Sequence, residues 1–150
     1  MTAHLHPKVV INSSDRWFLF LFGWTLLVGS FLHVLTATGI WPEKAPYWIG
    51  VYFDSLILFD FFGGVGLLVG LSKRTRQSIQ FNWWPLRYTL YLCVWICASN
   101  AVASGYMIYL DVLENYGSGF SVELRIVDLV IVVIGLVRSV KILRQNHDGF

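Results

Sequence analysis

The chain alternates long apolar segments with short polar ones. The apolar segments cover residues 16–40, 47–71, 86–110 and 121–143. Crossing the hydrocarbon core of a bilayer takes about 20 helical residues, and each segment is at least that long. Pro42 and Pro46 separate the first two segments, and proline cannot continue a helix. The pattern predicts one integral membrane domain, residues 1–150, folded as an all-α up-down bundle of four transmembrane helices.

Composition supports the membrane class. Hydrophobic residues make up 56% of the chain and charged residues 13%, whereas soluble domains average about 25% charged residues. The segments leave no room for a soluble catalytic domain. The net charge of +2 gives no basis for binding nucleic acid, which requires a basic surface.

The distribution of basic residues predicts the orientation of the helices. Lys44 is the one basic residue in the two connections at 41–46 and 111–120, which also carry several acidic side chains. By the positive-inside rule, both termini and the middle connection are expected in the cytoplasm. We therefore expect a multi-pass protein of a bacterial inner membrane. The other basic residues near the segments are Lys8, Arg16, Lys73, Arg74, Arg76, Arg87, Arg138, Lys141 and Arg144.

The first apolar segment is predicted to remain as a helix. Residues 17–40 form an apolar run that is far longer than the 7–15-residue apolar core of a signal peptide. Ser13, Ser14 or Asp15 is expected to cap the helix, which would start near Arg16, because short polar side chains accept hydrogen bonds from the first free backbone N–H groups.

Ionisable and polar side chains interrupt the apolar segments. A charge at membrane depth costs at least about 2.5 kcal/mol on insertion scales, so these residues need compensation. With the predicted orientation, most of them fall in the outer half of the membrane, and Asp60 lies closest to its midplane. Asp54 and Asp60 are six residues apart and point about 120° away from each other. The candidate intramembrane polar site consists of His33, Asp54, Asp60, Asn100, Arg125 and Asp128.

Two interpretations of these residues are open. In the first, they line a polar pocket that opens outward, in which Arg125 pairs with an aspartate, His33 titrates near neutral pH, and Asp60 binds a proton or a cation. In the second, Arg125 and Asp128 form a local pair at i,i+3 near the interface, and Asp54 is hydrated. Asp60 is too deep for the second interpretation, so we expect it to act in function or in a subunit contact.

The chain offers little for a metal or haem. A haem within the membrane needs an axial ligand, and His33 is the one histidine inside an apolar segment, so no haem is expected. The Glu-x-x-His pattern of di-metal carboxylate sites is absent, and no metal site is expected. Cys93 and Cys97 are interpreted as small packing residues. No catalytic residue is assigned, and the chain is not expected to be an enzyme. Bound lipid is expected. The remaining histidines are His4, His6 and His147.

Glycines cluster in the second segment. Small residues let transmembrane helices approach closely, and Gly66 and Gly70 match the G-x-x-x-G pattern of such contacts. The contacts could form within the chain or with another subunit, and the run of glycines could also permit a kink. The expected helix-packing residues are Gly63, Gly64, Gly66, Gly70 and Gly135.

These features favour two functional classes. The first is an accessory or structural subunit of a larger respiratory, photosynthetic or transport complex, packed through glycine-rich and aromatic helix faces. The second is an autonomous proton-coupled or small-polar-solute carrier or channel, with Asp60 as the coupling acid and Arg125 as its modulator. We expect the first class. The expected partners are the lipid bilayer and either other membrane subunits or further copies of the chain.

Overall fold

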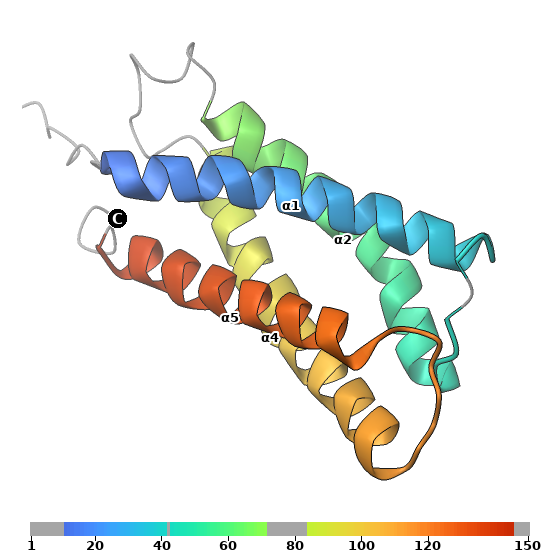
Figure 1. The fold of residues 1–150 in the computed structure, drawn as a ribbon. Coiled ribbons are helices and arrows are strands. Elements are labelled where there is room, and N and C mark those ends of the chain that lie inside the picture. The colour runs from blue at the N-terminus through green and yellow to red at the C-terminus, as the bar shows by residue number, and fades with distance from the viewer. Residues whose placement is uncertain (1–10, 42, 72–83, 146–150) are drawn as a thin grey trace, which may run out of the picture.

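The computed structural model describes residues 11–41, 43–71 and 84–145. This part of the chain is helical and contains no strand, which confirms the predicted all-α class (Figure 1). His4, His6, His147 and the basic residues at 73–76 lie outside the described residues. The helices are α1 (Ser13–Ala37), α2 (Tyr47–Gly70), α4 (Trp84–Leu113) and α5 (Val122–Gln145).

Three of these helices are long and apolar enough to cross a membrane, namely α1, α2 and residues Leu86–Leu113 of α4. They indicate a membrane protein. The fourth helix, α5, has sufficient length, but it carries more charged side chains than the other three. Those side chains are Glu123, Arg125, Asp128, Arg138, Lys141 and Arg144.

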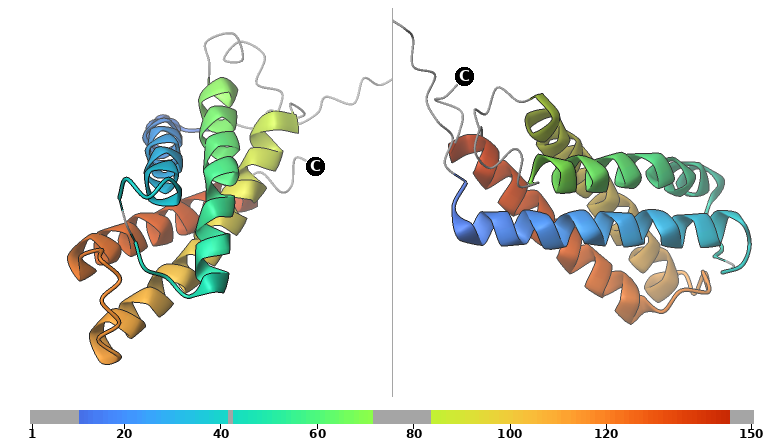
Figure 2. Two further views of the ribbon diagram at one scale, coloured as in Figure 1. Left: turned by 90° about the vertical axis from the view of Figure 1, so that its right-hand side faces the viewer. Right: turned by 90° about the horizontal axis from the view of Figure 1, so that it is seen from above.

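The helices form two antiparallel hairpins, α1 with α2 and α4 with α5 (Figures 1 and 2). The hairpins join mainly where α2 packs on α4, whereas α1 and α5 touch at few positions. We call the end that holds residues 38–46 and 114–121 the connection end. The hairpins cross at an angle, so α1 and α5 leave space between them.

The boundaries of α1 differ from the prediction for local reasons. The cap is Asn12, whose side chain accepts a hydrogen bond of 2.7 Å from the Asp15 N–H, so the prediction of a cap within residues 13–15 is wrong. The helix ends at Ala37, before the predicted end at residue 40. Gly39 follows with φ +74°, a left-handed conformation that favours glycine and terminates helices.

The glycines of α2 bring its two neighbours close. A Cβ atom added to Gly64 would lie 2.7 Å from the carbonyl oxygen of Gly23 in α1. One added to Gly66 would lie 2.3 Å from Thr89 Oγ1 in α4. Side chains at these positions would therefore push α2 away from both α1 and α4.

The other expected packing glycines also face helices of the same chain. A Cβ atom on Gly63 would lie 3.2 Å from Leu26 in α1, and one on Gly70 would lie 3.0 Å from Leu86 in α4. The Gly135 position in α5 would come within 2.7 Å of a Phe22 ring carbon. Close approach within one chain thus accounts for the glycine cluster.

Replacing Gly64 with alanine is expected to lower the free energy of unfolding by about 1 to 3 kcal/mol, the usual cost of overpacking. The added methyl group would meet backbone, which cannot rotate away. Gly50→Ala in the same helix is the matched control, because nothing lies within 4 Å of its Cβ position. Thermal unfolding in detergent measures both variants, and equal melting temperatures would contradict the close α1–α2 contact.

Candidate functional site

Arg125 joins three segments at the connection end. It lies in the first turn of α5, and its buried guanidinium forms an ion pair with Glu43, in the residues between α1 and α2. Its Nε atom lies 3.3 Å from Asp111 Oδ2, in the last turn of α4. Its Nη2 atom also donates a hydrogen bond of 3.1 Å to Ser118 Oγ. One cation is therefore shared by two carboxylates.

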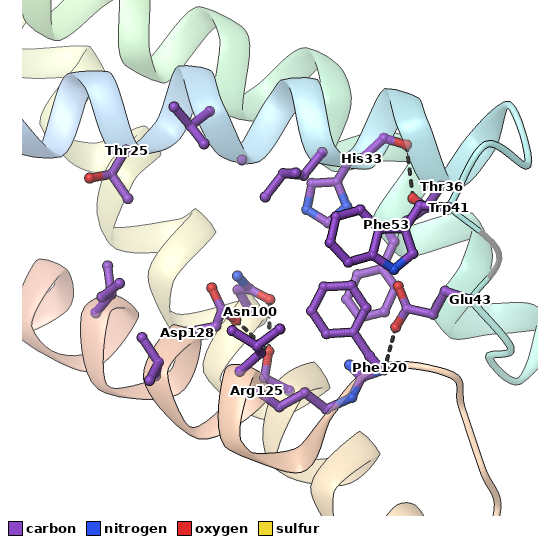
Figure 3. Close-up of a pocket in the computed structure, with 17 residues that line it drawn as sticks. Thr25, His33, Thr36, Trp41, Glu43, Phe53, Asn100, Phe120, Arg125 and Asp128 are labelled. Atoms are coloured by element: carbon purple, nitrogen blue, oxygen red, sulfur yellow. Dashed lines mark hydrogen bonds and ion pairs between the residues drawn. The ribbon is translucent and has the colours of Figure 1, made fainter.

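Further contacts join the two connections to each other. The Lys44 N–H donates to the Ser118 carbonyl oxygen at 2.7 Å, and the Ser118 hydroxyl donates to Asp111 at 2.7 Å. The rings of Trp41 and Phe120 stack with their centroids 5.4 Å apart. Figure 3 shows Glu43, Phe120 and Arg125 gathered at this end. We call this set of contacts the connection-end lock.

A second ion pair, at the opposite end of α5, joins this helix to α1. Arg138 Nη1 of α5 lies 2.9 Å from Asp15 Oδ1, near the start of α1. Asp15 is buried, and the Arg138 guanidinium also lies 5.7 Å from the centre of the Phe18 ring. Ion pairs therefore join α5 to α1 at this end and to the α1–α2 connection at the other, while α1 and α5 touch little in between.

A pocket of about 360 Å³ occupies the space between these ion pairs, a size typical of small-molecule sites. Phe53, Trp41 and Phe120 contribute aromatic rings to its wall. Side chains from α1 and α5 point into it from opposite sides (Figure 3). Its polar lining consists of Thr25, His33, Thr36, Glu43, Asn100, Ser104, Arg125 and Asp128.

Asp128 binds α4 instead of the arginine one turn away. The Ser104 hydroxyl lies 2.9 Å from Asp128 Oδ2 and 3.2 Å from Asn100 Oδ1. Arg125 forms its ion pairs with Glu43 and Asp111. The interpretation of Arg125 and Asp128 as a local i,i+3 pair is therefore wrong. The α1–α2 connection and the last turn of α4 each offer Arg125 a carboxylate, and Ser104 of α4 offers Asp128 a hydroxyl.

Asp60 lies behind the pocket wall, between α1 and α2. It is 4% exposed, and its Oδ1 atom is buried without a hydrogen-bond partner among the described residues. Its Oδ2 atom lies 3.9 Å from His33 Nε2, which is beyond direct hydrogen-bond distance. His33 lines the pocket and stacks on Phe53. The His33 ring therefore separates a buried carboxyl group from the pocket.

Asp54 interacts with His33 electrostatically but lies outside the pocket itself. It is exposed on α2 and does not line the pocket, whereas Asp60 on the same helix is buried. The helical spacing correctly separates the two aspartates. The structure thus brings His33, Asn100, Arg125 and Asp128 to one pocket and places Asp60 next to it.

Sequence reasoning missed the partners of the two arginines. Glu43 and Asp111 stand in the acidic connections, and Asp15 stands in the first turn of α1, where it served only as a possible cap. The sequence held a signal for Glu43 and Asp111, because both stand in acidic connections that are expected at the same end of the bundle as Arg125. Among the described residues, no three side chains of the metal-binding types cluster to hold an ion.

Comparison with known proteins gives no match, whether with family models, with curated proteins or with solved structures. The chemistry of the pocket is the basis for a functional proposal. It can hold a solute through polar groups, and it places a histidine between the solute and a buried acid.

Proposed function

We propose that this chain is an autonomous, proton-coupled carrier for a small solute that binds in the pocket through its polar group. The observation that carries the proposal is the position of Asp60. A buried carboxyl group with one oxygen unpartnered lies 3.9 Å from a histidine of the pocket wall. Intramembrane acids in such positions characterise proton relays.

The surroundings of Asp60 favour exchange of a proton. Burying the ionised carboxylate without hydrogen-bond donors costs much free energy, whereas burying the neutral carboxyl group costs far less. The imidazole of His33 can accept and donate a proton through its ring nitrogens, and a small rotation of the ring would bring its Nε2 atom, now 3.9 Å away, within hydrogen-bond distance of Asp60. Asp128 is close enough to interact electrostatically with Asp60, so a change at the solute site would alter the proton affinity of the acid. This is the coupling that a carrier needs.

The proposal includes a fourth span and an orientation. The 24 residues of α5 extend about 36 Å, enough to cross a hydrocarbon core of about 30 Å. No charged residue falls between Asp128 and Arg138. Arg125 and Asp128 face the pocket, so their charges need not meet lipid. We place both termini in the cytoplasm and the connection end outside, in a bacterial inner membrane.

Cysteine labelling tests this orientation. In right-side-out vesicles, a membrane-impermeant maleimide is expected to label Tyr116→Cys, in the exposed α4–α5 connection, and to leave Arg144→Cys unlabelled until the membrane is permeabilised. Native Cys93 and Cys97 are buried and give little background. Labelling of position 144 alone from outside would reverse the orientation, and the pocket would then open to the cytoplasm.

Proton flux tests the function. Purified protein in proteoliposomes, with a pH-sensitive dye enclosed, is expected to dissipate an imposed pH gradient faster than empty liposomes do. Flux that is no faster than in empty liposomes, across a panel of small amines, acids and neutral solutes, would count against a carrier.

A second candidate function is the accessory subunit of a larger membrane complex. One observation favours it: Asp54 is an exposed carboxylate on α2, and it acts on His33 only through space. A partner subunit could neutralise it. Native mass measurement after mild-detergent purification separates the candidates, because a subunit co-purifies with a partner and a carrier runs as a monomer or homo-oligomer.

A further inference from the structure

The ionisable groups around the pocket are not balanced in charge. Arg125 forms ion pairs with two carboxylates, those of Glu43 and Asp111, in the connection-end lock. Asp128 receives one hydroxyl contact from Ser104 and forms no ion pair with a described lysine or arginine. Asp60 adds a second carboxyl group behind the wall. The site therefore has an excess of acidic groups, and a bound cation would compensate it.

The rest of the lining fits an organic cation better than a metal ion. Carboxylates and carbonyl oxygens usually surround hard metal ions, but here the rings of Trp41, Phe53 and Phe120 form much of the wall. Aromatic faces attract alkylammonium groups through their ring quadrupoles. The Phe120 ring already lies 5.4 Å from the Arg125 guanidinium, which shows such a contact in this wall.

The pocket is bordered by apolar side chains where α1 and α5 diverge. Val28 and Leu32 on α1, and Leu124 and Val127 on α5, line the pocket and are also exposed. Ion pairs of α5 lie at both ends of this opening, with Glu43 at one end and with Asp15 at the other. In a bilayer the opening would face lipid chains, so an apolar portion of a ligand could lie there while its charged group is inside.

We propose that the pocket binds an amphiphilic organic cation, with its ammonium group beside Asp128 and its apolar part in the opening between α1 and α5. This inference names the solute class of the proposed carrier and therefore rests on that function. The same ammonium chemistry could come from a free alkylamine or from the headgroup of a lipid.

Equilibrium binding of radiolabelled hexyltrimethylammonium to the full chain in lipid-free maltoside tests the inference. The wild-type protein is expected to bind it, and Asp128→Asn is expected to bind it about tenfold more weakly or worse, since a partner of a desolvated charge is lost. Glu123→Gln, an exposed acid on the same helix, is the matched control and should bind as the wild type does. Asp128→Glu keeps the charge and should retain most of the binding.

Competitors identify which part of the ligand is recognised. Excess hexanoate should not displace the probe, and choline, which lacks the apolar chain, should displace it only weakly. Displacement by phosphatidylcholine would identify the lipid headgroup as a source of the ammonium group, and its failure would identify a free amine. Preference for hexanoate, or equal binding by the wild type, Asp128→Asn and Asp128→Glu, would overturn the inference.

The result of the binding experiment can be told apart from the result of the proton-flux experiment that tests the carrier proposal. Binding is measured without a membrane or a gradient, so proton flux without cation binding would reject the inference alone. Cation binding without flux would reject the carrier alone.

Discussion

Asp60→Asn is expected to abolish protein-dependent proton flux in proteoliposomes, leaving only the leak of empty liposomes. The amide cannot take up and release a proton, and Asp54, the other acid near His33, is exposed and lies outside the pocket. The substitution also removes a buried carboxyl group whose Oδ1 atom has no hydrogen-bond partner in the part of the chain that the structure describes. The variant is therefore expected to be at least as stable as the wild type, because an uncompensated buried charge is costly.

The combination of lost flux and retained stability is the diagnostic result. Thermal unfolding and gel filtration of the same preparations establish that Asp60→Asn is folded. Glu123→Gln, which changes an exposed acid to an amide, serves as the control and should keep wild-type flux. Wild-type flux in Asp60→Asn would show that the Asp60 carboxyl group does not carry the transported proton.

Arg125→Gln is expected to destabilise the protein by about 3 to 5 kcal/mol, the typical cost of removing one partner of a buried ion pair. Glu43 and Asp111 would be left without their shared cation, and the contacts of the connection-end lock would weaken with them. Arg125→Lys should recover only part of the loss, because an ammonium group cannot bridge two carboxylates as the planar guanidinium does. Thermal unfolding in detergent measures both.

Two further variants make this prediction specific. Arg144→Gln removes an exposed arginine near the end of the same helix and should change the stability by less than about 0.5 kcal/mol. Adding Glu43→Gln to Arg125→Gln should restore part of the stability, because one unpaired carboxylate is then removed. A double variant that is less stable than Arg125→Gln would contradict a stabilising ion pair between Arg125 and Glu43.

Much of the fold could be predicted from the sequence. The apolar runs and prolines located the helices, and the short connections favour antiparallel neighbours. The helix ends and the divergence of α1 from α5 could not be predicted. The ends depend on single hydrogen bonds, such as the one that Asn12 accepts. The divergence depends on which helix each glycine meets, and nothing in the sequence pairs Gly66 with Thr89.

For the site, the energetic cost of intramembrane charge pointed to His33, Asn100, Arg125 and Asp128, which line one pocket, but it did not reveal their partners. Helical periodicity correctly separated Asp54 from Asp60. It also suggested that Arg125 could pair with Asp128, because periodicity reveals only neighbours three or four residues apart on one helix. The actual partners, Glu43 and Asp111, lie on other segments, and the tertiary arrangement brings them to the guanidinium.

The most direct measurement is the reaction of Asp60 with an apolar carbodiimide, which modifies protonated carboxyl groups in the membrane. In right-side-out vesicles, followed by peptide mass spectrometry, modification of Asp60 is expected and should fall as the outer pH is raised at constant inner pH. That result would show that the buried acid exchanges protons with the outer side, as the pocket and His33 require. Modification that is absent, or that follows the inner pH alone, would contradict the account.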